Sequence, residues 1–155
     1  MQKKFMQRAI KEARKNLTDI QGGPFGACIV KRGRVIAVAR NTVLKNDATC
    51  HAEINTIRLA AKKLGTFDLS GCEIYSTTEP CPMCFAAIHW AKIVKIYYGT
   101  TISDVKKRGF NELAISNRVL KKLGGSAVKI IRDHARKECL GLLKDWDRLP
   151  DKQVY

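Results

Sequence analysis

The apolar residues of the chain recur with two different periods, and the changes of period predict the order of helices and strands. Apolar positions at helical spacing predict a first helix over residues 2–17. The residues on its apolar face are Phe5, Met6, Ala9, Ala13 and Leu17. Gly22-Gly23-Pro24 ends this segment, and two apolar runs then predict strands over residues 26–31 and 34–40. A turn at Arg32-Gly33 joins these two strands into a hairpin.

Beyond the hairpin, strand-like and helix-like segments alternate. The expected helices cover residues 52–64, 81–91, 112–123 and 135–149, and the expected strands cover residues 72–77, 93–99 and 127–131. This alternation predicts an α/β fold, a three-layer α/β/α sandwich with helices on both faces of the sheet. The hairpin makes the expected five-stranded sheet a mixed one. Because the 155 residues contain no repeat or linker, we expect a single domain over residues 1–155.

The chain is strongly basic, with 29 lysines and arginines against 14 acidic residues and a net charge of +15. The charge is spread over many short clusters, and several of them fall on polar helix faces. A hydrated surface therefore explains these charges as readily as binding to nucleic acid does. Nucleic-acid binding therefore stays a weaker alternative. No apolar run approaches the length of about 18 residues that a membrane span needs, and the basic N-terminus lacks the apolar stretch of a signal peptide. We expect a cytoplasmic protein without a membrane partner.

Six cysteines lie far apart in the sequence, except for Cys81 and Cys84. A chain of this size without an export signal is expected to keep them reduced rather than paired in disulfides. Cys28 and Cys72 fall in apolar strand-like runs and are expected in the core. Cys81 and Cys84 are left as a pair that can bind a metal ion.

Two short motifs predict a catalytic zinc site. His51-Ala52-Glu53 opens one expected helix, and Pro80-Cys81-Pro82-Met83-Cys84 opens another. Zinc prefers nitrogen and sulfur ligands in a tetrahedron, and a catalytic site keeps one position for water. Two cysteines three residues apart at a helix N-terminus can both point at one ion, and His51 supplies the third ligand. Glu53 is then placed to act as the base that activates the water.

Other interpretations of these residues account for less of the pattern. A lone Cys-x-x-Cys is common in structural zinc sites and redox pairs, but no second pair completes a structural site. His89 is expected to pack in its helix rather than bind the metal. A zinc-stabilised RNA-binding module without catalysis would have no need for Glu53. His-x-Glu followed by Pro-Cys-x-x-Cys is the signature of zinc nucleobase deaminases, which predicts hydrolytic replacement of an exocyclic amino group by oxygen.

At these motifs the chain resembles the cytidine-deaminase-like superfamily and, within it, the bacterial guanine deaminases. The residues that carry the resemblance are Gly22 to Ala27, Asn41, His51 to Glu53, Ile57-Arg58, Glu79 to Cys84, Ala87 to Ala91, Gly109-Phe110 and the terminal Tyr155. Trp90 and Pro82 favour the guanine deaminases over the tRNA adenosine deaminases. The resemblance implies one Zn²⁺ per subunit, held by His51, Cys81 and Cys84.

The resemblance also implies roles in substrate binding. Phe25 would pack against the purine ring, Asn41 would hydrogen-bond it and Trp90 would wall the pocket. The backbone amide of Ala52 or Cys81 is a further candidate for holding the substrate. Without the resemblance, Phe25 and Trp90 would be read as core aromatic residues, and Asn41 as a turn residue.

Two acidic residues and the terminal tyrosine complete the expected site. Glu53 would shuttle protons, and Glu112 would contact the purine and assist proton transfer, at a position where the family commonly has aspartate. The C-terminal segment would be swapped across a homodimer, so that Tyr155 closes the partner's pocket. The simpler alternatives are a helix cap for Glu112 and a frayed end for Tyr155.

The reaction expected from these residues is hydrolysis of the free base guanine to xanthine and ammonia. The main alternative is deamination of adenosine in tRNA, which a basic chain would suit. A second alternative is deamination of cytosine, a nucleoside or an aminotriazine.

Overall fold

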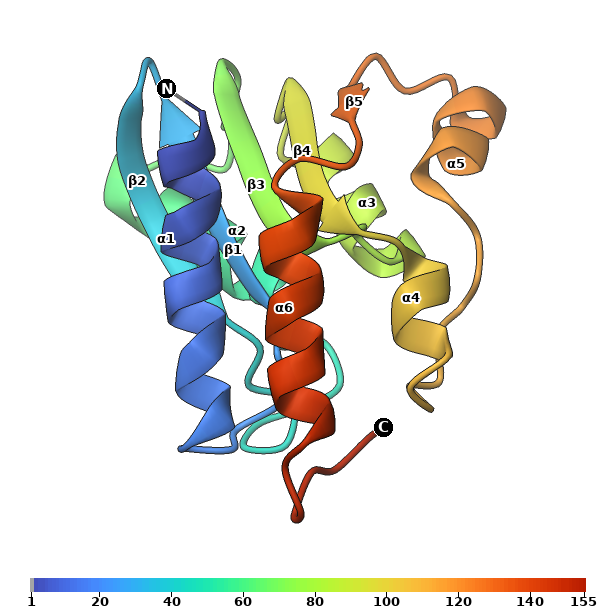
Figure 1. The fold of residues 1–155 in the computed structure, drawn as a ribbon. Coiled ribbons are helices and arrows are strands. Elements are labelled where there is room, and N and C mark those ends of the chain that lie inside the picture. The colour runs from blue at the N-terminus through green and yellow to red at the C-terminus, as the bar shows by residue number, and fades with distance from the viewer. Residues whose placement is uncertain (1) are drawn as a thin grey trace.

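A central five-stranded sheet, covered by helices on both faces, organises the structure (Figure 1). The computed structural model describes residues 2–155. The first half contains α1 (Lys3–Arg14), the 3₁₀ turn η1 (Lys15–Leu17), β1 (Gly26–Lys31), β2 (Arg34–Arg40), α2 (Ala52–Leu64) and β3 (Cys72–Thr78). The second half contains α3 (Pro82–Trp90), β4 (Lys95–Thr100), α4 (Ile102–Lys106), α5 (Asn117–Gly124), β5 (Lys129–Ile131) and α6 (Arg136–Asp147).

The sheet is mixed, as the hairpin predicted. Its strand order is β2-β1-β3-β4-β5. β1 runs antiparallel to both β2 and β3, whereas β3, β4 and β5 are parallel. The carboxyl ends of the three parallel strands therefore lie at one edge, where open α/β sheets bind ligands.

Each face of the sheet has its own core. α1 and α6 lie on one face, and α2 and α3 lie on the other (Figure 1). Successive residues of β1 point to opposite faces, so Cys28 packs on the α1 side and Ile29 on the α2 side. All six cysteines are free, and Cys28 and Cys72 are fully buried, as expected.

The structure confirms the predicted elements and moves one boundary by five residues, while the other shifts are smaller. β1, β2 and α2 have the predicted bounds. The helix predicted over residues 112–123 begins instead at Asn117, because the Ser116 hydroxyl caps it by accepting a hydrogen bond from the amide of Val119. Residues 112–116 form a loop, and Glu112 is not a helix cap. The short helix α4 was not predicted, although Thr101 and Asp104 form a capping box at its start.

Within residues 2–155, no helix has both the length and the apolar surface needed to pass through a bilayer.

The close contact between α1 and β1 provides a test of the packing. A Cβ atom at Gly26 would overlap the carbonyl oxygen of Ala9 on α1, whereas one at Gly141 on α6 would meet nothing within 4 Å. Gly26→Ala should therefore lower the free energy of unfolding by about 1–3 kcal/mol. Gly141→Ala, the control, should raise it by about 0.5–1 kcal/mol. Urea denaturation measures both, and equal effects of the two substitutions would contradict this packing.

Candidate metal centre and active-site pocket

Two helix N-termini point toward one place at the edge of the sheet. His51 is the N-cap of α2, and Cys81 is the N-cap of α3, which starts just beyond the end of β3. Both residues have extended backbone conformations, and Pro82 occupies the first turn of α3, where a missing N–H costs nothing. The partial positive charge of each helix start favours thiolates and other anions at this position.

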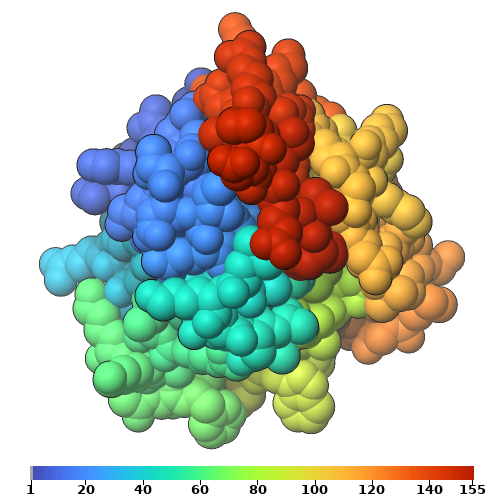
Figure 2. Space-filling model, turned by 90° about the horizontal axis from the view of Figure 1, so that it is seen from below, coloured from blue at the N-terminus to red at the C-terminus, as the bar shows by residue number. Residues whose placement is uncertain are grey.

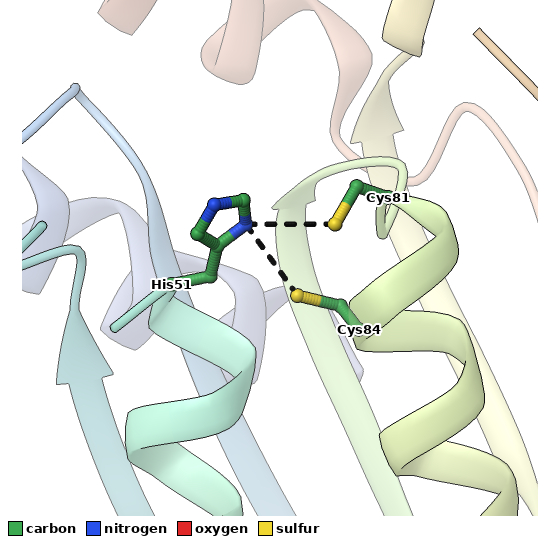
Figure 3. Close-up of side chains that lie close together, drawn as sticks. All are labelled: His51, Cys81 and Cys84. Atoms are coloured by element: carbon green, nitrogen blue, oxygen red, sulfur yellow. Dashed lines mark hydrogen bonds between the residues drawn. The ribbon is translucent and has the colours of Figure 1, made fainter. Parts of the chain in front are cut away.

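The three predicted ligands meet between these helices. His51 reaches across from α2 toward Cys81 and Cys84 at the start of α3 (Figure 3). Its Nδ1 atom lies 3.6 Å from the sulfur of Cys81 and 3.6 Å from that of Cys84. Within residues 2–155, this is the one cluster of three or more His, Cys, Asp or Glu ligand atoms close enough to share a metal ion.

The spacing of these donors fits zinc. Typical Zn–S and Zn–N bonds of about 2.3 and 2.0–2.1 Å at a tetrahedral angle place the sulfur and nitrogen atoms about 3.6 Å apart. That separation is the one observed for both cysteines. Three protein donors leave one tetrahedral position, so the set matches a catalytic rather than a closed structural site.

The electrostatics of the cluster favour an ionised ligand. A hydrogen bond from Cys84 lowers the pKa of Cys81 to about 4, and contacts with His51 act in the same direction. Burial opposes the charged form of His51, but its contacts with Cys81 outweigh burial and raise the pKa of the imidazole. These contacts favour the thiolate form of Cys81, which zinc binding requires.

Glu53 lies beside the metal ligands in the first turn of α2. Its side chain is buried, and the hydroxyl of Ser76 on β3 donates a 2.7 Å hydrogen bond to Oε1. Burial raises the pKa of Glu53, while His51 and the Ser76 hydrogen bond partly offset that shift. A carboxylate that can hold or release a proton under mild conditions suits a general base and acid.

A pocket of about 280 Å³ opens next to Glu53 and the ligands. The predicted site residues that line it are Phe25, Asn41, His51, Glu53, Cys81, Glu112 and Tyr155. Seven residues predicted for the site thus share one cavity, although they come from segments spread along almost the whole chain.

Aromatic rings form one wall of the pocket. Phe25 packs edge-on against Phe110, with ring centroids 5.2 Å apart, and Phe110 packs edge-on against Tyr155 at 5.3 Å. Phe25 is therefore a wall residue, not only a core residue. Phe110 belongs to the Gly-Phe motif of the sequence, but the motif alone did not predict that its ring lines the pocket.

Glu112 faces the same cavity from the loop before α5. Burial raises the pKa of its carboxyl to about 7, and the negative charge of Cys81 contributes in the same direction. The pocket thus contains two acidic side chains, Glu53 and Glu112, with raised pKa values. Pairs of this kind cluster at catalytic sites.

The C-terminus lies over the pocket of its own chain and is not frayed. The backbone amide of Gly23 donates a 3.2 Å hydrogen bond to the Tyr155 hydroxyl, and the amide of Asn111 donates one of 2.9 Å to the Tyr155 carbonyl. Figure 2 shows this tail wedged between the loop after β2 and the segment that contains α4. The exchange of the tail between two subunits stays a prediction.

Trp90 and His89 lie elsewhere than expected, whereas the expected role of the Ala52 backbone stays a prediction. Trp90 is 79% exposed and does not line the pocket, because it lies at the far end of α3, about 13 Å along the helix from Cys81. The side chain of Ala52 is buried in the core on the α2 side, which leaves only its backbone for the substrate. His89 is exposed and hydrogen-bonds Ser126 at 3.0 Å instead of packing in the core.

Asn16 positions two walls of the pocket, a role that the sequence motifs did not predict. It is fully buried, and its Nδ2 donates hydrogen bonds to the carbonyls of Gly23 at 2.8 Å and Asn41 at 2.9 Å. It thereby ties the turn before Phe25 to the end of β2. In the sequence, this role could have been inferred from the position of Asn16, a polar residue on the same helix face as the apolar Ala9 and Ala13.

Glu79 and Asn117 similarly hold the loop that carries Cys81. Glu79 is buried and accepts hydrogen bonds from the amides of Ile102 and Asn117. The side chain of Asn117 donates to the carbonyl of Pro80, directly before the first cysteine ligand. The loop therefore has a fixed path before any metal binds.

Comparisons with known proteins agree with this site. Residues 1–100 match the profile of the cytidine and deoxycytidylate deaminase zinc-binding region. The guanine deaminase of Bacillus subtilis is 42% identical over 116 residues, 74% of each chain. The tRNA-specific adenosine deaminase of the same species is 32% identical over 148 residues, 86% of this chain and 91% of that one.

Solved structures show the same fold. A guanine deaminase from Nitrosomonas europaea superposes with a TM-score of 0.87 at 28% identity, covering 96% of this chain and 86% of that one. A tRNA:A34 deaminase superposes with a TM-score of 0.77 at 35% identity, covering 90% and 98%. The chain therefore belongs to the zinc-binding cytidine and deoxycytidylate deaminase family. It is a zinc-dependent aminohydrolase.

Asn16→Ala tests the positioning role. The substitution removes the side-chain donor from two buried carbonyls, of which that of Gly23 keeps only the Phe25 amide, and it frees the walls that contain Phe25 and Asn41. The loss of a partner for a buried carbonyl costs about 1–3 kcal/mol. We expect kcat/KM for the nucleobase substrate to fall about tenfold, or 1.4 kcal/mol, with zinc content unchanged. The control Asn46→Ala, at an exposed asparagine, should change neither. An Asn16→Ala enzyme within twofold of wild type would show that Asn16 has no such role.

Proposed function

We propose that this chain deaminates free guanine, consuming water and producing xanthine and ammonia. The observation that carries the proposal is the partly buried carboxylate of Glu112, which faces the same cavity as Glu53 and the metal ligands. A guanine ring presents N–H donors, and a buried carboxylate is a natural acceptor for them. The similarity to two bacterial guanine deaminases supports the assignment.

The chemistry divides between the metal and the protein. When bound, zinc supplies an activated water at its open position. Glu53 takes a proton from the attacking water as the oxygen bonds to C2 of guanine, and it passes this proton to the ring nitrogen. It then takes the second proton from the new hydroxyl on C2 and gives it to the leaving amine. The bond from C2 to the exocyclic nitrogen breaks, the carbonyl of xanthine forms, and ammonia departs. The Ser76 hydroxyl keeps the Glu53 carboxylate in place during both transfers.

The remaining walls orient the base. Oδ1 of Asn41 accepts the amide of Val43 at 3.0 Å, so Nδ2 is the end of this side chain that can donate to a purine acceptor. Phe25 and Phe110 offer aromatic surface to a planar ring. These contacts fix the direction in which the exocyclic amine points, toward Glu53.

The size and cover of the pocket favour a free base over a nucleotide in RNA. The pocket volume of about 280 Å³ lies just below the range of roughly 300–1,000 Å³ for small-molecule sites. Tyr155 covers the pocket through its bond to Gly23, and a nucleotide still attached to its strand would have to displace it. The high net charge, +15, is the observation that favours the tRNA alternative.

Ammonia release from a panel of substrates tests the proposal. Guanine should exceed a tRNA anticodon stem, adenine and cytosine by well over tenfold, about 1.4 kcal/mol of discrimination. Zinc-loaded Glu53→Gln, which is nearly isosteric, should lose a factor of about 10²–10⁴. A preference for the tRNA would overturn guanine as substrate, and near-normal turnover by Glu53→Gln would overturn the role of Glu53.

The pH dependence tests Glu112 separately. Because burial raises the pKa of this carboxyl to about 7, it gains a proton below that pH and becomes a weaker, uncharged acceptor for the N–H groups of guanine. We therefore expect kcat/KM to fall as the pH drops through about 7. Glu112→Gln should have a low kcat/KM at all pH values and lack this acidic limb, with zinc intact. An unchanged acidic limb in the variant would assign it to another group.

We also propose a homodimer that uses the exposed face of α3. Met83 is 37% exposed and Trp90 is 79% exposed, and their spacing of seven residues places them on one side of the helix. Leu123, on the neighbouring α5, is 81% exposed. Large apolar side chains gathered at a surface are typical of protein interfaces, and the resemblance to dimeric deaminases supports a second copy as the partner.

Light scattering on Trp90→Glu tests the dimer. The wild type should be a dimer, Trp90→Glu should shift toward the monomer, and Phe67→Glu, at another exposed aromatic residue, should remain dimeric. A dimeric Trp90→Glu would exclude this face.

Mixing a Glu53→Gln chain with one that lacks residues 152–155 then tests the expected exchange of the tail. If the tails are exchanged, the intact tail of the Glu53→Gln chain covers the pocket of the truncated chain, which still has Glu53, and turnover returns. If each tail covers its own pocket, neither site in the mixed dimer is complete.

A further inference from the structure

A second cavity lies at the carboxyl ends of β4 and β5, next to the deaminase pocket, with which it shares the lining residue Glu79. Its volume is about 360 Å³. Three basic side chains from different elements line it: Lys106 of α4, Arg118 of α5 and Arg132 directly after β5. Figure 1 shows these elements along the same side of the molecule. The fold thus brings together three cations that are widely separated in the sequence.

These cations have no acidic partners within residues 2–155. None of the three forms an ion pair, whereas Arg108 and Arg136 nearby pair with Asp147 and Asp104. Asp104 is already engaged by both terminal nitrogens of Arg136, at 2.9 and 3.2 Å. The cavity therefore keeps its positive charge.

Glu79 is the one acidic residue among the cavity's lining residues, and its oxygens are already hydrogen-bonded. Oε2 accepts the amide of Ile102 at 3.3 Å, and Oε1 accepts that of Asn117 at 3.0 Å. Three cations against one carboxylate leave an excess of two positive charges. Such an excess, in a concave site, attracts anions.

The cavity also provides hydroxyl donors. Tyr98 and Ser103 line it, and Tyr98 is almost fully buried. Burial raises the pKa of the Tyr98 hydroxyl to about 12, so it keeps its proton and can donate. Two guanidinium groups offer paired N–H donors that match the oxygens of a phosphate.

We infer that this cavity binds the phosphate group of a small ligand, either inorganic phosphate or a phosphate monoester. Its limited volume of about 360 Å³, in contrast to the long basic groove that tracks a nucleic-acid backbone, favours a small anion over RNA. The site adjoins the deaminase pocket at two places. Glu79 lines both, and in one loop Leu113 lines the deaminase pocket and Ala114 lines the basic cavity. A bound anion would therefore contact the loop that carries Glu112.

Isothermal titration calorimetry on the full chain tests the inference. Inorganic phosphate and glycerol 3-phosphate are titrated in turn, with ionic strength held constant by chloride. We expect both to bind with a dissociation constant below about 1 mM, or 4.1 kcal/mol. The double variant Arg118→Gln with Arg132→Gln should bind at least tenfold more weakly. The control, Lys122→Gln with Lys129→Gln, removes the same charge from α5 and β5 outside the cavity and should bind as wild type does.

Three results would overturn the inference. Equal affinity in the arginine variant and the wild type would place the anion elsewhere. Equal weakening in the lysine control would mean that net charge, rather than this cavity, attracts phosphate. Binding of a 12-nucleotide single-stranded RNA without binding of either small phosphate would assign the basic residues to nucleic acid. The readout is binding alone, so these outcomes do not depend on the deaminase substrate.

Discussion

The site depends on holding three zinc donors at fixed separations. Two helix starts supply them: His51 caps α2, and Cys81 and Cys84 occupy the first turn of α3. Both helices pack on the same face of the sheet and against one another, so the separation of the donors is set by the core between them. The 3.6 Å distances from nitrogen to sulfur are thus a consequence of helix packing as well as of side-chain choice.

The other site residues are arranged around that centre by long-range contacts. Glu53 follows His51 by half a turn and is fixed by Ser76 of β3. Glu112 comes from a loop that Glu79 and Asn117 anchor at its far end, and Tyr155 comes from the end of the chain. Burial is common to all three side chains, and it raises the pKa of each. A protected pocket and ionisable groups with raised pKa values therefore have the same physical origin.

Local patterns in the sequence predicted the fold and the metal ligands well, and distant contacts poorly. Strand and helix periodicity located β1, β2 and α2 to the residue, and motif spacing identified His51, Cys81 and Cys84. The start of α5 was misplaced because helical periodicity does not reveal that Ser116, rather than Glu112, caps the helix. Asn16 escaped notice because its partners, Gly23 and Asn41, meet it only after the sheet has formed. Trp90 was placed in the pocket by resemblance, but the length of α3 carries it away from its own chain's site.

The central claim is a zinc ion with three protein ligands and one position open to water. X-ray absorption spectroscopy at the zinc edge, on protein purified without chelator, tests it most directly. The account predicts one zinc per chain, with two sulfur ligands at about 2.3 Å and two nitrogen or oxygen ligands at about 2.0–2.1 Å. Protein without zinc, or zinc enclosed by four sulfur ligands, would contradict it.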